Sequence, residues 1–231
     1  MAETRLKLAV FDCDGTLVDS VHSIVAAMHE ACEKMAVEKP EPAAIRRMIG
    51  LPLIDVVTAL VPGDDEAFHW QLRNHYADAF QRMRAEGVLQ EPLYPDAKAS
   101  IETLNEDGWL LGVATGKSRR GLDATLARHG LSHHFITLQT ADRAQGKPHP
   151  EMLHSAMADA GVEAHATIMI GDTTFDMEMA RNAGVRGVGV SWGYHDPDDL
   201  LSAGGTCVVD DFPALMEILS RMGNEHGQTV L

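Results

Sequence analysis

The sequence predicts an α/β protein, a Rossmann-like parallel sheet with helices on both faces plus an inserted α-helical cap domain. After Pro92, short apolar runs alternate with helical stretches, which is typical of a parallel sheet covered on both sides. One further apolar run stands near the start of the chain, and the stretch between, from about residue 20 to residue 86, has a helical pattern almost throughout. We therefore expect a core domain at residues 1–18 and 90–231 and a helical cap domain at residues 19–89.

The first strand is expected at residues 6–11, where an apolar run ends in Asp and Gly residues, as a buried strand does before a loop that carries a site. In the cap, apolar residues recur three and four positions apart, and Pro and Gly residues divide the block into roughly four helices. These breakers are Pro40, Pro42, the Gly50-Leu51-Pro52 stretch and the Pro62-Gly63 pair. Because the cap leaves directly after the Asp-rich loop, we expect it over the carboxyl ends of the strands, where open α/β sheets bind ligands.

The remaining strands are expected where apolar runs recur, at residues 109–114, 135–139, 167–170, 185–190 and 206–209. Helices are expected between them, at about residues 97–105, 118–129 and 150–161, from the end of the 167–170 strand to 183, and at about 212–222. Ser118 is the expected N-cap of its helix and Gly130 the stop, while Pro150 opens the next helix. The tail from Gly223 is expected to be loose.

The composition of the chain limits the kinds of molecule that it is expected to bind and the compartment in which it is expected to work. The formal net charge is −15, so association with nucleic acid or an anionic membrane is not expected. The three cysteines are Cys13, Cys32 and Cys207, an odd number without metal-type spacing, which indicates free thiols in a reducing compartment. No signal-peptide pattern or membrane-length apolar run is present, so we expect a cytoplasmic protein. The oligomeric state is not predicted.

Asp12 and Asp14 stand two positions apart at the end of the first predicted strand. An ionised carboxylate can attack phosphorus and divide hydrolysis into formation and breakdown of an aspartyl-phosphate. Two carboxylates this close repel unless a cation lies between them, and Mg²⁺ prefers hard oxygen ligands. Gly15 permits a tight turn around a phosphate. The alternative is an ordinary Asp-rich turn, in which Asp and Gly are common.

Three later segments also follow predicted strands. Thr115-Gly116 offers a hydroxyl and a main-chain N–H that can hold phosphate oxygens, although such a pair is usually structural. Lys147 stands before Pro148 in a rigid loop, where an ammonium group can neutralise phosphoryl charge, although lone loop lysines are usually solvated. Asp172 and Asp176 are four apart and share one side of a helical turn, and Asp172 alone could equally be an N-cap.

Taken together, these segments resemble the four signatures of the haloacid dehalogenase superfamily. Asp12-Cys13-Asp14-Gly15-Thr16 matches the first signature, Thr115 the second, Lys147 the third, and the segment from Gly171 to Asp176 the fourth. The resemblance covers nearly the whole chain. The helical insert, with Ile49-Gly50-Leu51-Pro52-Leu53, is similar to the small cap of the phosphoglycolate-phosphatase-like branch.

The resemblance implies a role for each matching residue. Asp12 would be the nucleophile and a Mg²⁺ ligand, and Asp14 the general acid and base, its main-chain carbonyl also binding the metal. Thr115 and the Gly116 amide would hold the phosphate, and Lys147 would steady the nucleophile and the transferred group. Asp172 would bind Mg²⁺, while Asp176 would orient Lys147 or a metal-bound water. Gly116 departs from the pattern, because relatives often carry Asn or Ser there, so a side-chain contact is lost.

The expected function is Mg²⁺-dependent hydrolysis of a small phosphate monoester, similar to phosphoglycolate or a sugar phosphate. Dehalogenation is disfavoured, because a halide needs no proton from Asp14 and no metal at Asp172, whereas an alkoxide needs the acid. A sugar-phosphate mutase similar to β-phosphoglucomutase and a non-catalytic binding protein on the same scaffold are the alternatives. Arg46, Arg47 and Lys117 are candidate substrate-selecting residues. Cys13 is expected to be a packing residue.

Overall fold

Six strands form one parallel sheet in the order β3-β2-β1-β4-β5-β6, within residues 6–62 and 65–225, the part of the chain that the computed structural model describes. The strands are β1 (Leu8–Phe11), β2 (Leu110–Thr115), β3 (Thr137–Thr140), β4 (Thr167–Gly171), β5 (Arg186–Val190) and β6 (Cys207–Val209). The order reverses between β1 and β4, and ligands of open parallel sheets bind at such a switch point, outside the carboxyl ends of the strands.

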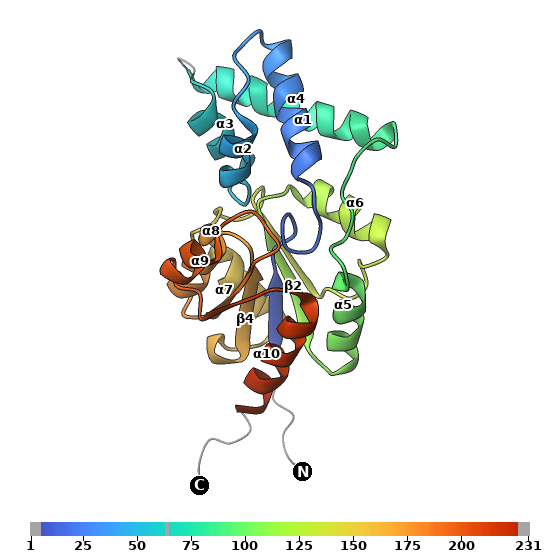
Figure 1. The fold of residues 1–231 in the computed structure, drawn as a ribbon, viewed down its shortest axis with the longest axis vertical. Coiled ribbons are helices and arrows are strands. Elements are labelled where there is room, and N and C mark those ends of the chain that lie inside the picture. The colour runs from blue at the N-terminus through green and yellow to red at the C-terminus, as the bar shows by residue number, and fades with distance from the viewer. Residues whose placement is uncertain (1–5, 63–64, 226–231) are drawn as a thin grey trace.

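Helices cover both faces of the sheet (Figure 1). One face packs against α5 (Ala97–Glu106), α6 (Arg119–His129) and α10 (Phe212–Glu225), and the other against α7 (Glu151–Ala160) and α8 (Thr174–Asn182). A short 3-10 turn (Ala164–Ala166) precedes β4, and α9 (Pro197–Ser202) lies between β5 and β6. These layers confirm the predicted fold class.

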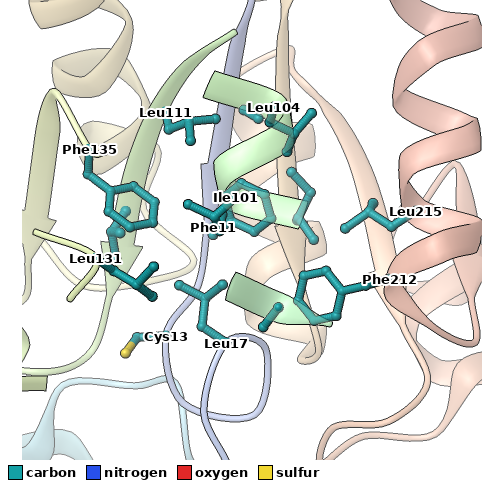
Figure 2. Packing of buried hydrophobic residues seen from close by; sticks show 14 of the residues in the cluster. Phe11, Cys13, Leu17, Ile101, Leu104, Leu111, Leu131, Phe135, Phe212 and Leu215 are labelled. Atoms are coloured by element: carbon teal, nitrogen blue, oxygen red, sulfur yellow. The ribbon is translucent and has the colours of Figure 1, made fainter. Parts of the chain in front are cut away.

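Alternation along β1 divides its side chains between two apolar clusters. Phe11 lies with Ile101, Leu104 and Phe212 on one face, as Figure 2 shows, while Val10 packs on the other face. Every residue of β1 is buried, as expected for the central strand of a sheet covered on both sides. The loop that follows β1 therefore starts from a fully buried strand at the centre of the sheet.

The inserted block folds as four helices, α1 (Val21–Lys34), α2 (Pro42–Met48), α3 (Leu53–Leu60) and α4 (Glu66–Ala85). They share an apolar cluster, which Tyr194 from the loop after β5 joins, and in Figure 1 they stand above the carboxyl ends of the strands. The two linkers run side by side: the Asp19 N–H donates to the Pro92 carbonyl at 2.9 Å, and the Tyr94 N–H donates to the Leu17 carbonyl at 3.0 Å. The chain therefore leaves the core and returns to it at adjacent positions.

Element positions agree with the sequence prediction to within about two residues for the strands. Ser118 caps α6 by accepting the Gly121 N–H, and Gly130 ends this helix in the left-handed conformation, as predicted. The last helix is longer than predicted, because α10 continues through Glu225, and the rest of the predicted loose tail lies outside the described residues. Among the described helices, none combines the length and the apolar character that crossing a membrane requires.

Candidate active site

The loop after β1 places Asp12 and Asp14 at the switch point of the sheet. The Asp12 N–H donates to the Ile170 carbonyl at 2.9 Å, and the Asp12 Oδ1 accepts the Cys13 N–H at 2.6 Å. Gly15 has a φ of +85°, and a Cβ there would lie 2.1 Å from the Asp172 Oδ2. Only glycine therefore allows the loop to approach the end of β4 so closely. Asp12 is completely buried.

Lys147 contacts one carboxylate of the first signature and one of the fourth. Its Nζ lies 2.8 Å from the Asp12 Oδ2 and 2.6 Å from the Asp176 Oδ1, and all three side chains are buried. Burial lowers the pKa of Lys147, but the two carboxylates outweigh burial and raise this pKa above its ordinary value. Lys147 therefore remains charged. It lies in the loop between β3 and α7, and its peptide bond to Pro148 is cis.

The N-terminus of α8 fixes the two carboxylates of the fourth signature. Thr173, rather than Asp172, is the N-cap, and it forms a capping box with Asp176. The Asp176 Oδ2 accepts the Thr173 N–H at 3.0 Å and its hydroxyl at 2.7 Å, which leaves Oδ1 directed to Lys147. Asp172 accepts the Thr16 hydroxyl at 2.7 Å and the Tyr194 N–H at 3.0 Å. Both side chains are thus held in place by protein groups.

Three buried carboxylates, of Asp12, Asp172 and Asp176, each offer an oxygen atom within 4.8 Å of the others. Burial raises the pKa of Asp12, and the charges of Asp176 and Asp14 add to this against the opposing effect of Lys147. Burial and the charges of Asp12 and Asp176 also raise the pKa of Asp172. One lysine does not balance three carboxylates, and the contacts of the Asp12 Oδ2 and the Asp176 Oδ1 with Lys147 are ionic without hydrogen-bond geometry. The site therefore fits a hard divalent cation such as Mg²⁺.

Asp14 belongs to a second buried cluster beside the first. The Asp14 Oδ1 accepts the Ser20 hydroxyl and lies 2.8 Å from the Lys117 Nζ. Lys117 also lies 2.9 Å from the Glu91 Oε1, and the Glu91 side chain is fully buried. No sequence motif points to Glu91, because it stands 26 positions from Lys117 and outside every signature. The one available signal is its place directly before Pro92, where the chain returns from the cap.

Thr115 is the last residue of β2 and Gly116 follows it, next to the loop after β1, and Thr115 is completely buried. Its hydroxyl accepts the Lys117 N–H at 3.3 Å. A Cβ on Gly116 would lie 2.6 Å from the Leu51 carbonyl oxygen and 2.7 Å from that of Gly50. The backbone of the cap therefore rests directly on the proposed phosphate-binding loop.

The same cap segment, residues 50–52, contacts two more loops of the core. A Cβ on Gly146 would lie 2.0 Å from the Pro52 Cγ, and a Cβ on Gly50 would lie 3.2 Å from the Thr173 Oγ1. The segment thus touches the loops of the second, third and fourth signatures. The structure has the cap seated on the core.

Arg46 and Arg47 are not brought to the site. The Arg46 Nη2 donates to the Gly193 carbonyl at 2.8 Å, and the guanidinium lies 5.6 Å from the centre of the Tyr194 ring. Arg47 is exposed, and its carbonyl pairs with the His195 Nε2 at 3.1 Å. Both residues lie outside the lining of the cleft between cap and core, since α2 faces the loop after β5. Their geometry joins the cap to the core and does not support substrate selection.

A cleft of about 460 Å³ lies between the cap and the core. Asp14, Gly116 and Lys117 line it on the core side, so Lys117, alone of the three predicted selecting residues, faces it.

Cys13 is buried in the apolar cluster of Figure 2, and burial raises the pKa of its thiol well above the usual range. Cys13 is thus a packing residue, as predicted.

Comparison with known proteins gives a consistent result. Residues 9–190 match the haloacid dehalogenase-like hydrolase family. A probable phosphatase of Dickeya dadantii is 37% identical over 210 residues, which are 89% of this chain and 90% of the relative. A phosphoglycolate phosphatase of Vibrio parahaemolyticus is 26% identical over 95% of this chain and 99% of the relative. A crystal structure of a hydrolase from Pseudomonas syringae matches with a TM-score of 0.81 and 27% identity, covering 93% of this chain and 98% of that one.

Proposed function

The chain belongs to the haloacid dehalogenase-like hydrolase family, in its phosphoglycolate-phosphatase-like branch, and from this premise we propose that it is a Mg²⁺-dependent hydrolase of a small phosphate monoester. The family match and the phosphatase names of the relatives confirm the predicted family and enzyme class. The observation that carries the mechanism is the contact of Lys147 with both Asp12 and Asp176 at the switch point of the sheet.

Asp12 is the proposed nucleophile. Its Oδ1 is fixed by the Cys13 N–H and its Oδ2 by Lys147, so the carboxylate is oriented before substrate arrives. In-line attack on phosphorus by this carboxylate gives an aspartyl-phosphate and an alkoxide. Lys147 and the main-chain N–H groups after Thr115 offset the charge of the transferred group. Asp176 holds Lys147 in place.

Asp14 is the proposed acid and base. It lies two residues from the nucleophile and lines the cleft from which the alcohol leaves. It protonates the leaving alkoxide, and the resulting carboxylate then removes a proton from the water that cleaves the aspartyl-phosphate. Ser20 and Lys117 hold its Oδ1. The same group can therefore serve both half-reactions.

Asp12, Asp172 and the main-chain carbonyl of Asp14 are the proposed ligands of Mg²⁺. When bound, the ion neutralises charge on the phosphoryl oxygens. The buried, under-neutralised carboxylates support this assignment. Asp176 completes the acidic cluster, but its capping box and its contact with Lys147 favour an orienting role.

The alternatives are less well supported. The mutase is not favoured, because the curated relatives described above are phosphatases. A β-phosphoglucomutase-like structure from Bacteroides vulgatus is 18% identical, which reflects the shared fold alone. A non-catalytic binding protein would need neither the buried pair of Asp12 and Lys147 nor a second acid at Asp14.

The decisive test is a screen for phosphate release over phosphoglycolate, sugar phosphates, nucleotides and alkyl phosphates, with Mg²⁺ and with EDTA. We expect release that needs Mg²⁺ and disappears in Asp12→Asn, since an amide cannot attack phosphorus. Asp78→Asn, which changes an exposed cap carboxylate in the same way, should retain activity. Steady-state hydrolysis by Asp12→Asn would refute the mechanism, and conversion of a sugar phosphate to its isomer without net release would favour the mutase.

A further inference from the structure

We propose that the cleft between cap and core binds an aromatic group on the leaving alcohol, so that the substrate is a phosphate monoester of a bulky aromatic alcohol. This inference rests on the proposed function and deepens it by naming a substrate class. It follows from the size of the cleft, the character of its walls and the contacts that its cationic residues already make.

One wall of the cleft is a stripe along α4. Five residues of this helix recur three and four positions apart, which places them on one side of it. All five line the cleft: Trp70, Arg73, Tyr76, Phe80 and Arg84. Tyr76 and Phe80 stack with ring centres 5.7 Å apart. Aromatic side chains of this kind bind another flat ring by stacking or edge contact.

A second part of the lining is aliphatic and adjoins the stripe. It is formed by α1, α2, α3 and the segment that joins α2 to α3, through Ile24, Met28, Ile45, Ile49, Leu53 and Ile54. The Asp14 carboxylate and the Gly116 loop lie at the core end of the cleft, where the phosphate would bind. A substrate bound there directs its alcohol portion toward the cap, where the aliphatic residues and the aromatic stripe line the cleft together.

The volume of the cleft is larger than a very small alcohol would fill. Its volume of about 460 Å³ falls within the range of pockets that enclose drug-sized ligands. The alcohol portion of phosphoglycolate has only a few heavy atoms and would leave most of the apolar wall in contact with water. An aromatic alcohol would bury that surface instead.

Two cations at the core end, Lys117 and Arg84, are already paired, whereas Arg120 at the start of α6 also lines the cleft and is exposed. Lys117 contacts Asp14 and Glu91, and Arg84 contacts Glu91 at 3.4 Å and lies over the Phe80 ring. A glycolate carboxylate would have to compete with a fully buried Glu91 for these groups. Arg73 stands about 16 Å farther along α4 than Arg84, beyond the reach of a short carboxylate.

The test compares three primary-alcohol monoesters: ethyl phosphate, phosphoglycolate and 2-phenylethyl phosphate. Ethyl and 2-phenylethyl phosphate differ in the aromatic ring and not in the leaving oxygen, so a difference in kcat/KM reports on the cleft. We expect kcat/KM for 2-phenylethyl phosphate to exceed that for ethyl phosphate about 100-fold, as burial of a ring allows. Equal values, or a preference for phosphoglycolate, would overturn the inference.

A matched pair of variants locates the effect. Phe80 lies 5.3 Å from the Lys117 Nζ, near the phosphate end, so Phe80→Leu should lower the ratio of kcat/KM for the aromatic and ethyl esters about three- to tenfold. Phe68 is half-buried on the same helix but does not line the cleft. Phe68→Leu should therefore leave the ratio as in the wild type. A ratio unaffected by Phe80→Leu would count against the stripe.

Binding separates this inference from the proposed function. Calorimetry on Asp12→Asn measures the affinities of 2-phenylethyl phosphate and ethyl phosphate without turnover, and we expect the aromatic ester to bind about 100-fold more tightly. Preferential binding without hydrolysis of any ester by the wild type would refute the hydrolase and keep the inference. Hydrolysis of all three esters at equal kcat/KM, with equal affinities, would keep the hydrolase and refute the inference.

Discussion

The position that a Cβ of Gly116 would take lies 2.6 Å from the carbonyl oxygen of Leu51, so the backbone of the cap occupies the space of a side chain in the core. The sequence had marked Gly116 as a departure from the family pattern, where Asn or Ser is common. The departure has a steric cause: with glycine at this position, residues 50–52 can rest on the loop after β2. The cap and the phosphate-binding loop are thus fitted to each other.

Gly116→Ser should therefore impair turnover without unfolding the protein. The added side chain would displace the cap by a contact with backbone, and misplacement on this scale can cost on the order of tenfold to hundredfold in kcat/KM. Steady-state kinetics measures the loss, and thermal unfolding checks the fold. Gly121→Ala is the control, because a Cβ there meets only the Ser118 Oγ at 3.4 Å. Wild-type kinetics in Gly116→Ser would show that this seated position of the cap is not needed.

Lys147→Met should strongly destabilise the protein in EDTA. It removes the cation that lies between the buried Asp12 and Asp176 carboxylates, and breaking a buried ion pair typically costs about 3–5 kcal/mol. Urea unfolding measures the change in the free energy of unfolding. Adding Asp176→Asn should recover part of the loss, because it removes one unpaired carboxylate. Lys98→Met, in an exposed pair, should change stability by less than about 1 kcal/mol.

The core of the site was predictable because a parallel sheet brings the carboxyl ends of its strands to one edge. Asp12, Thr115 and Asp172 each follow a buried apolar run, and Lys147 stands in the loop before a Pro-initiated helix. The predicted strand ends and the residue types were therefore sufficient to predict that these side chains lie close together. The register of the strands then sets the distances.

Other parts of the site depend on contacts that leave no residue-type signal. The Arg46 guanidinium binds the Gly193 carbonyl and Asp172 accepts the Tyr194 N–H, and either main-chain group could belong to almost any residue. Glu91 reaches Lys117 only because the linker returning from the cap runs beside the linker that leaves. These placements need the three-dimensional path of the chain.

Glu91 should contribute stability that depends on pH. Burial alone would raise the pKa of Glu91, but Lys117 and Arg84 outweigh burial and hold this pKa below its ordinary value of 4.5. The contribution is therefore present above about pH 4.5 and is lost as the pH falls through the lowered pKa, where the folded protein must also take up the proton.

Glu91→Gln should lower the urea midpoint at pH 7, and its difference from the wild type should shrink as the pH falls below 4.5. Glu86→Gln is the control, because Glu86 is half-exposed in its pair with Arg82 and should have a small effect at either pH. A difference between Glu91→Gln and the wild type that stays constant from pH 7 to pH 3 would mean that the charge of Glu91 is not the stabilising feature.

Asp14→Asn should distinguish leaving groups that need a proton from those that do not. If Asp14 is the acid, its loss slows formation of the aspartyl-phosphate most for alkyl esters, whose alkoxides are poor leaving groups, by about 10²- to 10⁴-fold. It slows p-nitrophenyl phosphate much less in that step, because nitrophenolate leaves without protonation. A burst of nitrophenolate followed by slow turnover is then expected, since the same variant lacks the base that activates water. Rapid-quench kinetics resolves the two phases. Equal loss for both esters in the first phase would assign Asp14 a structural role in holding Ser20 and Lys117 instead.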